Sequence, residues 1–174
     1  MRLFIRVSIL LSFLYALFIS SCTVNYSFTG ADIPAEAKTI SVGLFTVGPK
    51  ATLANPAEGD RFTNALITTM LTQTNLDMIE DKGDLRFEGS IVNYTNTAVA
   101  MQSDTEASNR NRLTMTVNVI YTNTIEPEKS FERTFKNFAD FDAADNLSDV
   151  EEELMEVINQ TISQDIFNAS IGSW

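Results

Sequence analysis

Residues 113–121 constrain the fold more than any other stretch, because apolar and polar side chains alternate along them. The apolar positions are Leu113, Met115, Val117, Val119 and Tyr121, and Thr114, Thr116 and Asn118 stand between them. A period of two residues is typical of a β-strand with one buried face and one wet face. The pattern therefore predicts a strand over residues 112–123 that needs a second layer to cover its apolar side.

Other segments carry weaker strand signals, and turn residues separate them. In the first, Ile40, Val42 and Leu44 are expected on one face and Phe45 on the other. Gly83 ends a polar turn, and the polar stretch 101–110 is expected to be a flexible loop. The predicted strands cover residues 38–47, 76–80, 85–98, 112–123 and 131–138.

Two segments have apolar residues at spacings of three and four. The pattern predicts an amphipathic helix over residues 57–74 and a second one with which the segment 142–174 ends. Ser148 with Glu151 fits a capping box at the start of the second helix. The order is strand, helix, several strands, helix. It favours an α+β fold in which two helices pack on one face of a roughly four-stranded mixed or antiparallel sheet.

The N-terminal segment has the pattern of a secretory signal. Arg2 and Arg6 precede an uncharged apolar run of about 13 residues, too short for a bilayer span of roughly 20. The run ends in Ile19-Ser20-Ser21-Cys22, which resembles the bacterial lipobox, and Cys22 is the one cysteine of the chain. We expect the signal 1–21 to be removed and Cys22 to be lipidated. An uncleaved anchor helix is the alternative.

The remaining chain divides into a lipidated tether arm over residues 22–38 and a single α+β sandwich domain over residues 39–174. In this arrangement the lipid on Cys22 attaches the protein to a membrane. Thr23 follows the cysteine, and under the enterobacterial sorting rule that residue directs a lipoprotein to the outer membrane.

Charge and composition exclude several classes of function. The net charge of −11 becomes −13 once Arg2 and Arg6 leave with the signal, which excludes nucleic acid as a partner. The chain has no histidine, and lipidation removes its one thiol. We therefore expect no catalytic residue, metal or cofactor. A hydrolase using Asp84, Glu88 or Asp104 is the remaining enzymatic alternative, and no spacing supports it.

Several short motifs, taken in order, resemble the Bacteroidetes branch of the LptE family. They are Tyr26-Ser27-Phe28-Thr29-Gly30 after Cys22, Lys38-Thr39-Ile40-Ser41-Val42, Gly83-Asp84-Leu85, Phe87-Glu88-Gly89, Asn111-Arg112-Leu113-Thr114, and Asp165-Ile166-Phe167-Asn168 before Trp174. The resemblance covers most of residues 22–174. It implies a lipopolysaccharide-assembly lipoprotein on the periplasmic side of the outer membrane. The implied fold is a two-helix, four-strand sandwich that binds and plugs an LptD-like β-barrel.

The resemblance also implies contact with lipopolysaccharide through basic residues, although this chain is acidic. The candidates are Arg86, Arg110, Arg112, Arg133 and Lys136. Arg86 and Arg133 are expected on neighbouring strands, and ion pairs with Glu88 or Glu132 are the alternative role. A different class of function also stays open: a stand-alone periplasmic lipoprotein that binds a lipid or small ligand in a closed apolar pocket between helices and sheet.

Overall fold

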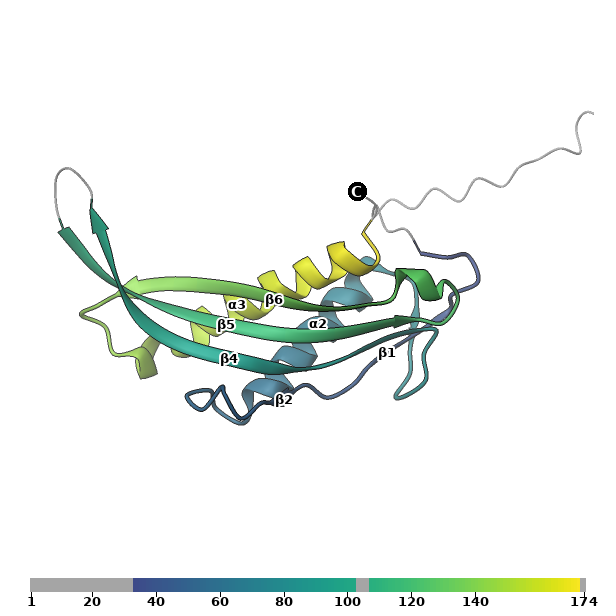
Figure 1. The fold of residues 1–174 in the computed structure, drawn as a ribbon, viewed down its shortest axis with the longest axis horizontal. Helices are drawn as coiled ribbons and strands as arrows, with labels where there is room; N and C mark the ends of the chain where they lie inside the picture. Colours follow the sequence, from purple (N-terminus) through teal and green to yellow (C-terminus); the bar gives the residue numbers. More distant parts are fainter. Residues whose placement is uncertain (1–32, 103–106, 173–174) are drawn as a thin grey trace, which may run out of the picture.

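The computed structural model of the protein describes residues 33–102 and 107–172, and Cys22 lies outside them. Figure 1 shows two layers, a long twisted sheet and two helices packed on one of its faces. None of the helices in these ranges is long and apolar enough to cross a membrane. The elements in order are β1 (Thr39–Val42), β2 (Thr46–Val47), α2 (Glu58–Gln73), β3 (Asp77–Met78), β4 (Leu85–Gln102), β5 (Ala107–Asn123), η1 (Pro127–Lys129), β6 (Phe131–Asp142) and α3 (Leu147–Ser170).

The sheet is mixed, with the order β3-β1-β4-β5-β6 and with β2 beside β4. β4, β5 and β6 run antiparallel, whereas β1 and β2 are both parallel to β4. The α+β class and the two helices on one face are confirmed. The sheet has six strands in place of the roughly four predicted, because the first extended segment divides into β1 and β2 and a short β3 pairs with β1.

The division of the first segment corrects the predicted orientation of its side chains. Phe45 is 1% exposed and Leu44 is 63% exposed, the reverse of the expected arrangement. The Phe45 ring packs edge-on against Phe62 of α2, with 4.9 Å between centroids. The backbone N–H of Phe45 also donates to Thr63 Oγ1 at 2.9 Å. Contact with α2 therefore decides which side chain points inward.

The predicted loop at 101–110 is wrong at both of its ends, because β4 continues to Gln102 and β5 already begins at Ala107. Its middle, residues 103–106, lies outside the described residues. The antiparallel register runs without a gap from Asn93↔Thr116 to Gln102↔Ala107. The hydrogen bonds between the two strands join backbone groups. Polar side chains therefore do not interrupt the pairing where both faces of the hairpin can be exposed to solvent.

The start of α3 differs from the predicted capping box. Asn146 is the N-cap residue and no side chain caps the helix, so Ser148 lies within the first turn. The Glu151 carboxylate instead accepts a hydrogen bond from the Tyr94 hydroxyl of β4. Burial and that hydrogen bond raise the pKa of Tyr94, which stays protonated as the donor.

The core lies between the helices and one face of the sheet. The alternation predicted for β5 is confirmed, since all five of its apolar positions are buried. In β4 the register shifts between Ile91 and Asn93, which turns Tyr94 inward to 2% exposure. Other core residues include Ile40, Phe62, Leu66, Met70, Leu85, Phe87, Met155, Ile158, Ile162, Ile166 and Phe167.

Asp84 joins the start of β1 to the start of β4. Its Oδ2 accepts hydrogen bonds from the backbone N–H of Lys38 at 2.9 Å and of Thr39 at 3.0 Å, and from Thr39 Oγ1 at 2.9 Å. The backbone N–H of Lys38, followed by the Thr39 donors, lowers the pKa of Asp84 below its ordinary 3.8.

Replacing Asp84 with asparagine is expected to lower the melting temperature at pH 7. A carboxylate with a lowered native pKa stabilises the fold above its unfolded pKa, and this stabilisation is lost as the pH falls through the native value. The difference in melting temperature between the wild type and D84N should therefore become smaller below about pH 4. Thermal unfolding followed by circular dichroism from pH 7 to pH 2 measures it. A constant gap would show that the charge of Asp84 does not contribute.

Candidate functional site

The sheet surface away from the helices is mainly polar and is called the helix-free face here. Its side chains come from alternate positions of β4, β5 and β6, and most are hydroxyls, amides or charges. Its members are Arg86, Glu88, Ser90, Asn93, Thr95, Thr97, Arg110, Arg112, Thr114, Thr116, Asn118, Ile120, Thr122, Glu132, Thr134, Lys136, Phe138 and Asp140.

Of the five basic candidates, the structure brings only Arg110 and Arg112 together. Both lie on β5 at the far end of the helix-free face and contact Asp140, whereas Lys136 lies opposite Thr116, near the middle of β6. Arg86 lies at the other end of that face, and its Nε donates to the Gly83 carbonyl at 3.1 Å. Arg133 lies on the opposite face, its guanidinium 5.1 Å from the centroid of Phe131.

The expectation that Arg86 and Arg133 lie on neighbouring strands is therefore wrong. β5 separates β4 from β6, and the two side chains belong to opposite faces. Among the described residues, neither arginine forms an ion pair with Glu88 or Glu132. The Glu132 carboxylate accepts a hydrogen bond from Asn118 Nδ2 at 2.8 Å.

Arg112 has well-defined partners. Its Nε and Nη2 donate to the two carboxylate oxygens of Asp140 at 2.6 and 2.8 Å, and its guanidinium lies 3.6 Å from the centroid of Phe138. The ion pair lowers the pKa of Asp140 and raises that of Arg112. Arg110 Nη2 reaches the Asp140 carbonyl at 3.4 Å. The Arg112 guanidinium is therefore already bound to Asp140 and is less available to an external phosphate.

Sequence reasoning missed Asp140 and Phe138, although Phe138 is 46% exposed beneath the Arg112 guanidinium. The signal was the alternation of β6, which places both on the helix-free face. Recognising the partnership also required the register of β5 against β6.

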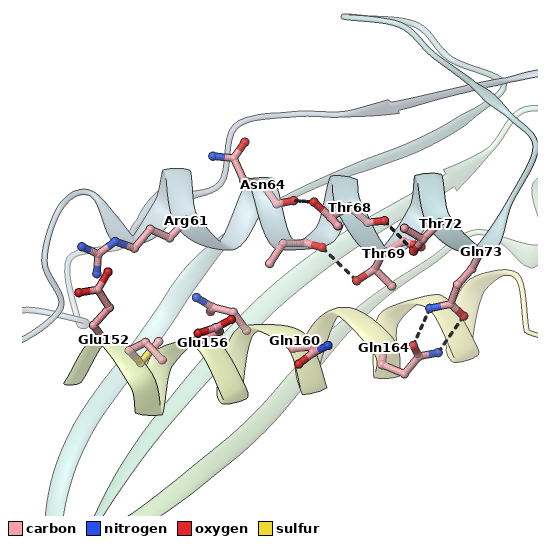
Figure 2. A pocket seen from close by; sticks show the side chains of 13 residues that line it. Arg61, Asn64, Thr68, Thr69, Thr72, Gln73, Glu152, Glu156, Gln160 and Gln164 are labelled. Atoms are coloured by element: carbon pink, nitrogen blue, oxygen red, sulfur yellow. Dashed lines mark hydrogen bonds between the residues drawn. The ribbon is translucent and has the colours of Figure 1, made fainter. Parts of the chain in front are cut away.

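A groove of about 640 Å³ runs between α2 and α3 on the outer side of the helix layer (Figure 2). At one end, Gln73 and Gln164 exchange hydrogen bonds of 2.6 and 3.2 Å. Arg61 and Glu152 lie at the other end. Most of the residues that line it are of polar types, although apolar atoms contribute much of the surface: Arg61, Asn64, Ala65, Thr68, Thr69, Thr72, Gln73, Glu152, Met155, Glu156, Asn159, Gln160 and Gln164.

One polar contact is buried where the helices meet. Asn159 Nδ2 donates to Glu58 Oε1 at 2.7 Å, and Glu58 Oε2 lies 3.6 Å from Arg61 Nη1. Glu58 is only 2% exposed, so its carboxylate depends on these partners. The contact joins α2 to α3, and sequence reasoning gave no indication of it.

These surfaces do not supply the pocket that a stand-alone lipid carrier requires. The groove lies between the two helices and faces outward, whereas the space between helices and sheet is filled by side chains such as Phe62, Leu66 and Val117, which have no exposed area. Within the described ranges, no group of three or more histidine, cysteine or acidic residues could hold a metal ion. Asp84 is engaged by Lys38 and Thr39, and Asp104 lies outside the described residues.

The fold and these surfaces define a two-layer α+β domain with a polar, helix-free sheet face. A family model described as LptE, lipopolysaccharide-assembly, matches residues 37–170, and the chain belongs to that family. The family consists of non-enzymatic assembly lipoproteins, so this protein acts in lipopolysaccharide assembly and is not an enzyme. The match concerns the family as a whole, and the Bacteroidetes branch stays a prediction.

The solved structures that this protein resembles have low sequence identity to it. A hypothetical protein from Chlamydia trachomatis is 8% identical, with a TM-score of 0.52 over 77% of this chain and 98% of that one. A minor lipoprotein from Acinetobacter baumannii is 16% identical, with a TM-score of 0.48 over 78% of this chain and 97% of that one. The comparison with curated proteins found no match.

Proposed function

We propose that this protein is an outer-membrane lipoprotein, anchored through a lipid on Cys22, that binds and plugs an LptD-like β-barrel during lipopolysaccharide assembly. The observation that carries the proposal is the LptE family match over residues 37–170. The sequence before Cys22 supports the anchor and the compartment.

The helix-free face supports a position inside a barrel. The interior of a transmembrane β-barrel is polar, and some barrels hold a plug. Neutral hydroxyl groups on this face, such as those of Thr95, Thr116 and Thr122, can exchange hydrogen bonds with such a wall without burying an unpaired charge.

Direct contact with lipopolysaccharide is proposed for the basic residues of the same face. Arg110 at its far end and Lys136 near its middle can each approach a phosphate, whereas the Arg112 guanidinium is held by Asp140. Arg86 and Arg133 are weaker candidates, because Arg86 is at the other end of the face and Arg133 is on the opposite face.

Site-specific photocrosslinking in intact cells tests whether the protein plugs the barrel or only docks on it. One probe replaces Thr134, exposed on the helix-free face, and the other replaces Gln160, exposed on α3. A plug is surrounded by the barrel wall, so both probes should yield the same crosslinked barrel. A product from one probe alone would contradict plugging, and no barrel product from either would contradict the proposal.

A further inference from the structure

The two sides of the long β-hairpin are protected differently. Beyond Ile91, where β2 ends its pairing, no described strand lies beside β4 on the side away from β5. Residues 93–99 therefore form a border of the sheet, called the open edge here (Figure 1). An edge strand presents unpaired backbone N–H and C=O groups that another strand can join.

The composition of the open edge sets it apart from the opposite border. Its sequence, Asn-Tyr-Thr-Asn-Thr-Ala-Val, has no charge, proline or glycine. The opposite border, β6, carries five charges in twelve residues, including Arg133 and Lys136. Charges, lysine in particular, are a common means of preventing edge-to-edge pairing. One border of this sheet is therefore protected, and the other is left able to pair.

The register identifies which backbone groups point outward. The backbone carbonyls of Phe87 and Ile91 accept hydrogen bonds from the N–H groups of Gly43 and Gly48. In this part of β4, the backbone N–H and C=O groups of odd-numbered residues therefore point away from β5. The shift between Ile91 and Asn93 changes the alternation, which turns the N–H and C=O of Asn96 and Ala98 outward. Both residues are exposed.

Charge on the helix side of the open edge favours one kind of partner. The Tyr94 hydroxyl bonds the Glu151 carboxylate, and the first turns of α3 hold four acidic residues and no basic one: Asp149, Glu151, Glu152 and Glu153. Arg61 is the one basic residue of α2. A second copy of the chain would bring an equal acidic group to the same place, which is unfavourable. A basic strand would be attracted.

We infer that the open edge is a docking site for an extended segment of a protein partner, which adds a strand to the sheet and places basic side chains beside the start of α3. This inference goes beyond the proposed function, because it does not depend on which protein supplies the segment.

The test uses the full chain purified in detergent and a synthetic ten-residue peptide in which lysine alternates with threonine and valine. Amide hydrogen exchange should show that the peptide protects the N–H groups of Asn96 and Ala98 but not those of β6. The same peptide with glutamate in place of lysine should bind at least tenfold more weakly.

Substitutions at Asn96 separate backbone pairing from side-chain contact. Asn96→Pro removes an outward N–H without breaking the β5 ladder, and Asn96→Ala keeps that N–H. We expect N96A to bind the lysine peptide like wild type and N96P to bind at least tenfold more weakly. If N96P does not fold, the wild type can be tested with a lysine peptide whose alternate backbone amides are N-methylated. That peptide cannot pair as a strand and should bind at least tenfold more weakly than the unmethylated one.

Four results would overturn the inference. They are no protection by the lysine peptide, equal binding by N96P and N96A, equal binding of the glutamate peptide, and protection without any peptide that rises with protein concentration. The last would assign the edge to a second copy of the chain.

Discussion

Replacing Gly89 with alanine is expected to destabilise the protein by about 3 kcal/mol, the upper end of the usual cost of overpacking. A Cβ on Gly89 would lie 2.0 Å from the Asn118 carbonyl oxygen and 2.6 Å from the Phe45 ring. Neither neighbour can move freely, because the first belongs to the β5 backbone and the second is buried against Phe62. Urea denaturation followed by circular dichroism measures the loss.

Gly43→Ala is the matched control for this prediction. Its Cβ would lie 3.4 Å from Glu88 Cγ and 3.6 Å from the Phe87 carbonyl oxygen, which are ordinary contacts. G43A should therefore unfold close to the wild-type midpoint while G89A unfolds at much lower urea. Equal midpoints for the two variants would show that Gly89 is not needed to seat Phe45.

Replacing Cys22 with alanine is expected to move the protein from the membrane fraction to the soluble periplasm with its fold intact. Each buried methylene of an acyl chain contributes about 0.8 kcal/mol, and a single chain alone holds a protein only marginally. Three chains on one cysteine would hold it almost permanently. Fractionation of cells producing C22A measures the change, and Thr23→Ala, which keeps the cysteine, is the control.

The mass of the wild-type protein separates the two explanations for any C22A that remains with membranes. A mature chain that begins at an acylated Cys22 means that a partner retains the variant. A wild-type mass that includes residues 1–21 and lacks acyl chains would contradict the anchor and indicate an uncleaved helix.

Sequence periodicity predicted the elements whose side chains have one buried face. The five apolar positions of β5 and most apolar positions of α2 and α3 fall where they were expected, because burial requires those spacings; Val157 of α3, expected in the apolar stripe, is 52% exposed. The same reasoning failed at Leu44 and Phe45. There Phe45 points inward because it packs between α2 and the space above Gly89, and both elements are distant from it in the sequence.

Polarity misled the prediction in the hairpin. The stretch 101–110 is polar, yet the backbone ladder of β4 and β5 continues from Asn93↔Thr116 to Gln102↔Ala107. The Arg112–Asp140 pair could not be found for a related reason. The two residues are 28 positions apart, and only the strand register brings them together.

The identity of the protein crosslinked from position 134 decides whether a β-barrel surrounds this lipoprotein. Mass spectrometry of the product should find one outer-membrane β-barrel, and the same barrel should be crosslinked from position 160. Products containing only soluble periplasmic proteins, from a protein that is folded and attached to the membrane, would contradict the proposed function.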